Sequence, residues 1–288
     1  MSELSKKARN RTKVQMILTM LVIVSIIRQF FLGNYHNMFL GILTLILFMV
    51  PQFIDKKLGV TIPVGLETVI LIFIFSAEIL GEINAFYVKI PVWDTILHTT
   101  NGFLMAAIGF ALIDLFNRSD RFSIKMSPYF VAFFAFCFSM TIGVLWEFFE
   151  FGMDTVFKTD MQKDRIVQTI SSVELNPDKK NNAIVINNIN KTVIYYTDQN
   201  GMQKEQVIDG GYLDLGIKDT MKDLLVNFVG AIVYSLIGYC YIKGRDGYKF
   251  AEWFIPKRKT AQEIEQTKLE DLLIKQNKLE KRKKKKNK

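Results

Sequence analysis

The chain has 288 residues, of which 50% are hydrophobic and 13% aromatic, and its formal net charge is +9. Two cysteines, Cys137 and Cys240, do not make a disulfide framework, and we expect both to be small apolar side chains in packed helices. No P-loop, strand-linked GxGxxG, GxSxG, HExxH or CxxC sequence is present, which excludes the most common signatures of soluble enzymes.

The hydrophobic residues gather into six blocks separated by polar segments. A helix needs about 20 apolar residues to cross a hydrocarbon core of about 30 Å. Each block is about that long, so we predict an all-α, polytopic membrane helix bundle with about six transmembrane helices. The first block is too long for a signal-peptide core and is expected to remain as a span. The predicted spans are residues 14–32, 38–54, 64–84, 93–116, 128–151 and 221–242.

The basic residues alternate along the chain in a way that predicts topology. They lie in residues 1–13, after the second span, between the fourth and fifth spans, and after the sixth. Residues 33–37 contain no Lys or Arg, and residues 81–92 contain only Lys89. The positive-inside rule therefore places both termini in the cytoplasm. The basic residues on the predicted inner side include Lys6, Lys7, Arg9, Arg11, Lys13, Lys56, Lys57, Arg118, Arg121, Lys125 and Lys243.

Two polar regions flank the sixth span. Residues 155–218 are predicted to form a small extracytoplasmic insertion with strands at 183–186, 192–196 and 203–208. The sequence DQNG at 198–201 indicates a hairpin turn between the last two strands. Residues 244–288 form a charged tail with a predicted basic helix. Beside a bilayer, its KRKKKK sequence at 281–286 is expected to contact anionic lipid headgroups rather than nucleic acid.

Acidic residues and one imidazole fall near the predicted outer ends of four spans. They recur at spacings of three or four, which places them on one face of each helix. An ionised group at such a depth costs several kcal/mol unless it is paired, hydrated or protonated. We therefore predict a binding site for an ion or ligand in the 14–243 transmembrane domain. Its candidate residues are Glu78, Glu82, Asp94, His98, Glu147, Glu150, Asp154, Asp219, Asp223 and Asn227.

Some of these residues have simpler interpretations. Asp94 and Asp219 begin helices and could cap free N–H groups. Asp154 could be solvated at the interface. Glu67 and Asp114 are expected at the inner membrane interface, outside the site.

Four segments in order carry a family resemblance: LGE at 80–82, WDTILH at 93–98, WEFFEFGMD at 146–154 and GYLDLGIKDTMKDLLVNFVGA at 211–231. Together they resemble the YjdF-like family of bacterial integral membrane proteins, which is distantly similar to the VanZ-like proteins. The resemblance covers residues 60–245 and implies a polytopic helical protein of the bacterial cell membrane. It implies no reaction, although VanZ-like proteins are associated with lipoglycopeptide resistance at the cell surface.

Three functions remain open from the sequence. The first is binding or transport of an ion, a proton, or a lipid or envelope component through the acidic site. The predicted site contains no Arg or Lys, which disfavours a bare phosphate as its ligand. The second is a membrane hydrolase or transferase using Mg²⁺, Mn²⁺ or Ca²⁺, with His98 or Glu147 as general base. His36, the only other histidine, lies in the first predicted outer loop, which excludes a three-histidine zinc site. The third is a scaffold in which the polar groups only hold helices together.

Overall fold

The computed structural model describes residues 3–57, 60–117, 126–244 and 253–259, together with positions 263 and 265. The chain divides into two compact units. Unit 1 comprises Met1–Met140 and Asn227–Lys288, and unit 2 comprises Thr141–Val226. The predicted tail helix beyond position 265 and the basic loop at 118–125 lie outside the described residues.

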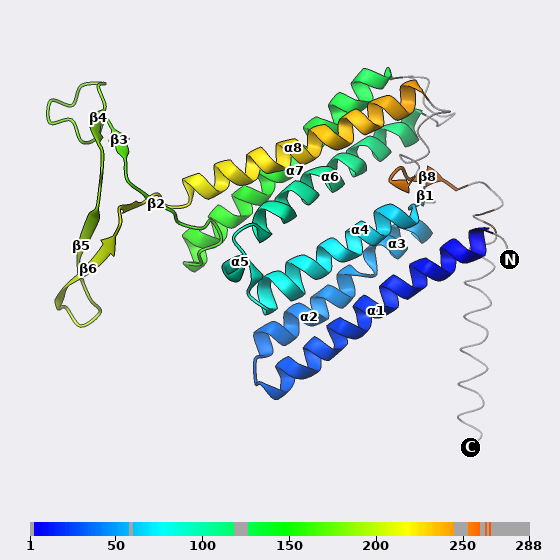
Figure 1. The fold of residues 1–288 in the computed structure, drawn as a ribbon, viewed down its shortest axis with the longest axis horizontal. Coiled ribbons are helices and arrows are strands. Elements are labelled where there is room, and N and C mark those ends of the chain that lie inside the picture. Colours follow the sequence, from blue (N-terminus) through cyan, green and yellow to red (C-terminus); the bar gives the residue numbers. More distant parts are fainter. Residues whose placement is uncertain are drawn as a thin grey trace. The chain divides into compact units, whose positions relative to one another are not determined.

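Six helical segments in the described part of the chain are long and apolar enough to cross a membrane, which confirms the six predicted spans. They run from Lys13 to Phe31, Tyr35 to Ile54, Val64 to Ile83, Trp93 to Asp114, Pro128 to Phe157 and Ile217 to Lys243. Figure 1 labels the helices α1 (Glu3–Phe31), α2 (Tyr35–Leu47), α3 (Val50–Lys57), α4 (Val64–Phe75), α5 (Phe86–Lys89), α6 (Trp93–Asn117), α7 (Pro128–Phe157) and α8 (Ile217–Lys243).

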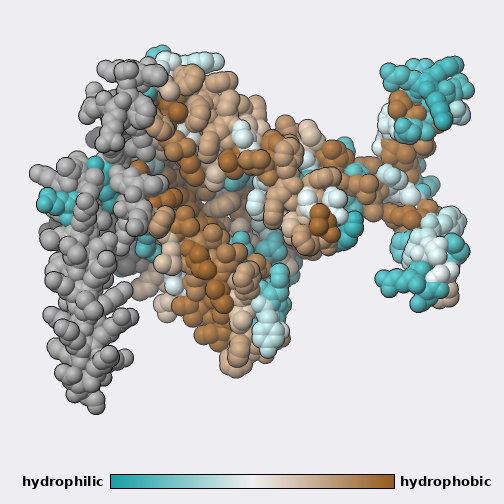
Figure 2. All heavy atoms as spheres, turned by 180° about the vertical axis from the view of Figure 1, so that it is seen from behind, coloured by the Kyte–Doolittle hydropathy of each residue, from teal (hydrophilic) through white to brown (hydrophobic). Residues whose placement is uncertain are grey.

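Unit 1 has two apolar clusters. The first joins α1, α2 and α4 around Val22, Phe48 and Leu71, and these three helices lie side by side in Figure 1. The second cluster joins α4 and α6 to residues of α7 and α8 that belong to this unit, and Phe110 and Tyr234 are among its fully buried members. Apolar side chains also cover much of the outside of the helices (Figure 2), as expected for surfaces that face lipid.

Two glycines allow α6 and α8 to approach closely within unit 1. A Cβ atom added at Gly230 would lie 2.0 Å from the carbonyl oxygen of Thr99, and one added at Gly102 would lie 2.1 Å from the carbonyl oxygen of Asn227. Both contacts are with backbone atoms, which cannot rotate away. Small residues at such crossings are the usual means by which membrane helices pack without a hydrophobic driving force.

The predicted third span is not a uniform α-helix. α4 ends at Phe75 and the chain continues as a π-helix, η1, over Ser76–Ile83. Beyond η1, Ala85 adopts the left-handed conformation with φ 58° and precedes α5. The hydrophobic pattern predicts a helix here but does not distinguish α from π winding. Short π-helical segments are rare and occur frequently at functional sites.

A short segment after the last span packs into unit 1. The strand β8 (Lys257–Arg258) pairs antiparallel with β1 (Val60–Thr61), and the two lie side by side in Figure 1. Ile255 is fully buried, and the Tyr234 hydroxyl donates a hydrogen bond to the carbonyl oxygen of Phe254 at 3.3 Å. This segment belongs to residues 244–288, for which the sequence predicts a charged tail and gives no sign of the pairing with β1.

Ile255→Ala is expected to lower the free energy of unfolding by about 2–5 kcal/mol, since it removes a fully buried side chain from the second cluster. Thermal unfolding of the purified protein measures the change. Ile184→Ala, at a side chain with 40% of its surface exposed, is the matched control and should change stability little. Equal stability of the two variants would show that the 253–258 segment does not hold unit 1 together.

Unit 2 contains the described strands β2 to β7, which form two-stranded antiparallel pairs. β2 (Ile166–Val167) pairs with β7 (Tyr212–Leu213), and β3 (Ile170–Ser172) with β4 (Ile184–Ile186). β5 (Lys191–Thr197) pairs with β6 (Gln203–Asp209) over seven residues. In the turn between them, Asp198 accepts hydrogen bonds from the backbone of Asn200 and Met202, and the Lys204 ammonium holds the pKa of this carboxyl below its ordinary value.

Candidate functional site

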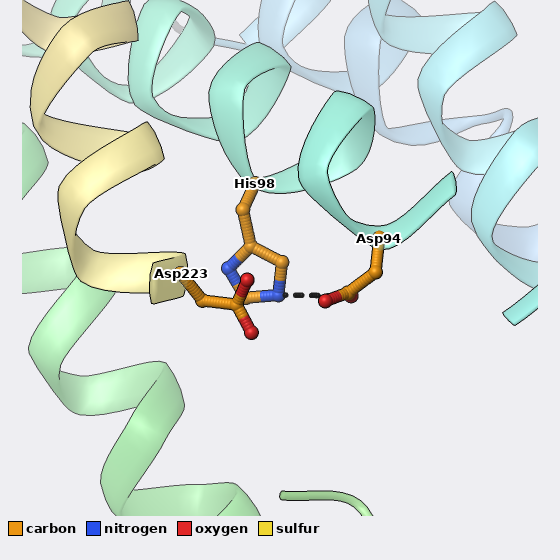
Figure 3. Close-up of side chains that lie close together, drawn as sticks. All are labelled: Asp94, His98 and Asp223. Carbon is orange, nitrogen blue, oxygen red and sulfur yellow. Dashed lines mark ion pairs between the residues drawn. The ribbon is translucent and has the colours of Figure 1, made fainter. Parts of the chain in front are cut away.

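Asp94 and His98 form an ion-pair contact on α6 (Figure 3). The distance from His98 Nε2 to Asp94 Oδ1 is 3.4 Å, and the side chains are 12% and 22% exposed, respectively. Asp94 is the second residue of α6, so it lies in the first turn rather than at the cap position. There its negative charge is favoured by the helix dipole. The pair therefore combines a carboxylate and an imidazole one turn inside a membrane-length helix.

Glu78 and Glu82 lie on the π-helix η1 rather than on an α-helix. Glu78 is half-buried and Glu82 is exposed. Trp93, at the start of α6, donates its indole N–H to the carbonyl oxygen of Ser76 at 3.3 Å, which connects α6 to the first residue of η1. The two segments that carry Glu78 and Asp94 are thus joined near their acidic residues.

Asn227 lies in a polar contact inside unit 1. Its Oδ1 accepts a hydrogen bond from Asn101 Nδ2 at 3.2 Å, and its Nδ2 lies 3.6 Å from Met140 Sδ. Nearby, the Ser139 hydroxyl donates to the carbonyl oxygen of Gly102 at 2.8 Å. The Asn227 side chain is therefore used to hold α6 against α8, a role that the Asp223-to-Asn227 spacing did not reveal.

Glu147 and Glu150 are both buried on the part of α7 that belongs to unit 2. Glu150 accepts a hydrogen bond from the indole N–H of Trp146 at 2.8 Å. The side-chain amide of Gln162 contacts the backbone oxygen of Glu147 at 3.5 Å and donates to the Thr220 hydroxyl at 2.7 Å. These contacts fix the last turns of α7 beside the start of α8 within unit 2.

Asp154 anchors the chain where it leaves α7. Its carboxylate accepts hydrogen bonds from the Thr159 hydroxyl at 2.7 Å and from the backbone N–H groups of Met161 and Gln162 at 2.7 and 2.8 Å. The alternative of a merely solvated aspartate is wrong, because both oxygens accept hydrogen bonds from the segment that follows the helix.

Asp154→Ala is expected to raise the rate of tryptic cleavage after Lys158 and Lys163 by roughly tenfold or more, because it removes three hydrogen bonds that are each worth about 0.5–1.5 kcal/mol. Mass spectrometry of timed digests measures the cleavage. Asp178→Ala, in an exposed turn elsewhere in unit 2, should leave cleavage at these two lysines unchanged. Identical digestion of the two variants would contradict the anchoring role.

Asp219 connects α8 to the strand segment. Its Oδ1 accepts a hydrogen bond from the Arg165 guanidinium at 2.7 Å, and its Oδ2 accepts from the backbone N–H of Lys163 at 3.0 Å. The predicted cap role for Asp219 is wrong, since α8 begins two residues earlier, at Ile217. Asp214 performs that role by accepting from the backbone N–H of Lys218 at 2.9 Å.

Asp223 is buried one turn further along α8, and a lysine lies between the two aspartates. The Lys222 ammonium is 3.5 Å from Asp223 Oδ1 and 3.9 Å from Asp219 Oδ1. The expectation that Arg and Lys are absent from the acidic region is therefore wrong, because Arg165 and Lys222 both contact its carboxylates. The spacing of Lys222 from Asp219 could have predicted its contact, whereas Arg165 is too distant in sequence.

The candidate residues fall into two groups according to unit. Two further acids, Glu67 and Asp114, are buried within unit 1 rather than exposed at an interface. The part of the candidate site in unit 1 consists of Glu78, Glu82, Asp94, His98 and Asn227, and the part in unit 2 consists of Glu147, Glu150, Asp154, Asp219 and Asp223. Asp154, Asp219 and Asn227 each accept a hydrogen bond that connects separate segments of the chain.

Comparison with known proteins gives one family match. Residues 13–244 match the model of a family described as "Predicted membrane protein (DUF2238)". No curated protein and no solved structure matches the chain. The family match covers all six candidate spans and the strand segment, and it ends before the 253–258 segment.

Proposed function

We propose, from the premise that the chain belongs to the family of predicted membrane proteins DUF2238, that this integral membrane protein binds a cation through the Asp94–His98 pair of α6. Binding there would serve the recognition or transport of the ion, or of a lipid or envelope component that carries it. The observation that supports this proposal most directly is the Asp94–His98 pair, which lies in the first two turns of a membrane-length helix. Ionisable groups at such positions are rare and commonly mark ion and proton pathways.

The two donors of the pair suit a small set of ions. Asp94 lies in the first turn of α6 and His98 follows it by one turn, so both side chains lie on the same face of one helix. A carboxylate and an imidazole suit a proton or a divalent cation such as Mn²⁺, Mg²⁺ or Ca²⁺.

The orientation is part of the same proposal. The basic residues that precede the first span and follow the second and sixth favour cytoplasmic termini in a bacterial cell membrane. The acidic ends of the spans and residues 155–218 would then face outward, and the Lys-rich tail would contact anionic lipid. The resemblance to YjdF-like and VanZ-like proteins agrees with a role at the cell envelope.

Manganese binding by the purified protein in lipid nanodiscs tests the proposed function. Equilibrium dialysis should give about one bound Mn²⁺ per chain, because Asp94 and His98 make one site. Proteoliposomes loaded with a Mn²⁺-sensitive dye then separate transport from simple binding. Absence of saturable binding of Mn²⁺, Mg²⁺ or Ca²⁺, together with absence of proton flux, would refute the proposal.

A second candidate function is a scaffold, in which the polar groups only hold segments of the protein together. The contacts of three acidic or amide residues favour this role for those residues. Asp154, Asp219 and Asn227 each make hydrogen bonds that hold segments together. Our proposal assigns Asp94 and His98 to the cation. A bound metal would also be the first requirement of a membrane hydrolase, and release of phosphate or a headgroup from lipid substrates would distinguish that activity from transport.

A further inference from the structure

The hairpin of β5 and β6 in unit 2 leaves large apolar and aromatic side chains exposed. Ile194 is 44% exposed, Tyr195 75% and Tyr196 43%. Successive residues of a strand point to opposite faces, so both faces of β5 carry exposed side chains. Among the strands that the structure describes, β5 pairs only with β6. A two-stranded hairpin is marginally stable in water unless a further strand or a helix packs against it.

The outer edge of β5 presents the backbone groups of every second residue. At the two ends of the hairpin, the N–H of Asp198 donates to the carbonyl oxygen of Met202 at 2.9 Å, and the N–H of Gly210 donates to the carbonyl oxygen of Asn190 at 2.8 Å. The register between these ends is continuous, so the backbone groups of the even-numbered residues of β5 face β6. Because this direction alternates along an antiparallel strand, those of the odd-numbered residues point away from β6.

The two strands of the hairpin differ in charge. β5 has one charged residue, Lys191, at its first position, and its remaining residues through Thr197 are uncharged. β6 has three charged residues, Lys204, Glu205 and Asp209. Charged side chains on an edge strand discourage its pairing with another strand. The β5 edge of the hairpin is therefore the one that lacks protection against the addition of a strand.

We propose that β5 pairs antiparallel with β5 of a second copy of this chain, with Tyr195 on the two-fold axis. In this register Tyr195 lies opposite Tyr195 of the second copy, and Ile194 lies opposite Tyr196 on each side of the axis. Pairs of aromatic residues, and of aromatic with β-branched residues, are favourable cross-strand combinations. The two-fold axis closes the assembly at two chains, and the charged β6 strands become the outer edges of the joined sheet.

The membrane favours a second copy over an unrelated extended segment as the partner of β5. The chain has six helical segments that are long and apolar enough to cross a bilayer. Copies inserted in the same orientation therefore carry β5 at the same distance from the membrane plane. This shared level and orientation raise the effective concentration of one β5 strand for another. The proposed interface contains neither Asp94 nor His98, so it is independent of cation binding.

Disulfide cross-linking of the full-length protein in native membranes tests the pairing and its register. Tyr195→Cys places two thiols across the axis, where opposed residues of a hydrogen-bonded pair lie about 5.5 Å apart at Cα, a distance that a disulfide spans. Glu205 lies directly opposite Tyr195 on β6 and is also exposed, so Glu205→Cys is the matched control. Mild oxidation should cross-link Tyr195→Cys about tenfold faster than Glu205→Cys, whose thiol lies beyond disulfide reach of its counterpart. The wild type, which contains Cys137 and Cys240, gives the background. Equal rates for the two variants, or no cross-linking of Tyr195→Cys, would overturn the inference.

Proline at the same two positions tests the interface without a cross-link. Tyr195→Pro removes an N–H that points away from β6, so it keeps the bonds of the hairpin and blocks pairing with a second copy. Glu205→Pro removes the equivalent N–H from the outer edge of β6. Native mass spectrometry of the detergent-solubilised protein should show dimers for the wild type and Glu205→Pro, and monomers for Tyr195→Pro. A dimeric Tyr195→Pro would reject the interface. A monomeric wild type would reject it too, and slow labelling of Tyr195→Cys by a water-soluble maleimide would then indicate that lipid covers the strand.

Discussion

Asp94→Asn is expected to reduce the affinity for Mn²⁺ by about 100-fold or more, since removal of even a supporting group at a metal site commonly costs 10–100-fold. The amide keeps the size of the side chain but loses the negative charge that the proposed cation requires. The Asp94 side chain is 22% exposed and its Oδ1 lies 3.4 Å from His98 Nε2, so the substitution changes the proposed pair directly. Equilibrium dialysis in nanodiscs measures the change against the wild-type protein.

The matched control for this substitution is Glu205→Gln, which also converts an acid to its amide. Glu205 lies on the exposed strand β6 and should have no effect on binding. Thermal unfolding without metal separates a binding defect from a folding defect, because Asp94→Asn should still unfold cooperatively. Wild-type Mn²⁺ affinity in a folded Asp94→Asn variant would remove Asp94 from the site.

Gly230→Ala is expected to destabilise the protein by about 3 kcal/mol or more, a value at the upper end for overpacked sites. The added methyl group would lie 2.0 Å from the carbonyl oxygen of Thr99 and 2.9 Å from the backbone nitrogen of Phe103. Because both neighbours are backbone atoms of α6, only separation of the helices relieves the overlap. Thermal unfolding, followed by intrinsic tryptophan fluorescence, measures the loss.

Gly152 provides the control for glycine replacement in a helix. It lies within α7, and a Cβ atom added there has nothing within 4 Å. Gly152→Ala should leave stability unchanged or raise it by roughly 0.5–1 kcal/mol through the lower entropy of the unfolded chain. If both alanine variants unfolded at the same temperature, close α6–α8 packing would not be a determinant of stability.

The spans could be predicted because their signal is local. A block of about 20 apolar residues specifies a membrane helix whatever its neighbours are, and all six blocks correspond to helices in the structure. The π-helical winding of Ser76–Ile83 could not be predicted in this way. It depends on which carbonyl group each N–H reaches, and the hydrophobic pattern carries no information on that choice.

The candidate site was predictable as a set of acids but not as a set of contacts. Spacings of three and four placed Asp219, Asp223 and Asn227 on one helical face, and all three are buried. Two of these residues have hydrogen-bond partners that lie far away in the sequence. Arg165 lies 54 residues from Asp219, and Asn101 lies 126 residues from Asn227. Such long-range pairs can be identified only from the three-dimensional structure. They show which of the polar residues hold separate segments of the chain together.

The pairing of β1 with β8 also constrains how the protein is made. Val60 pairs with Arg258, so the last four of the six candidate spans lie between the two partners in the sequence. Synthesis proceeds from the N-terminus, and every span is therefore translated before β8 exists. Gly65, at the start of α4, packs against Trp253 and so acquires this neighbour only near the end of translation. A chain that stopped after Lys243 would contain all six spans and pass through membrane insertion, yet it would present an uncovered apolar surface to the quality-control machinery of the cell.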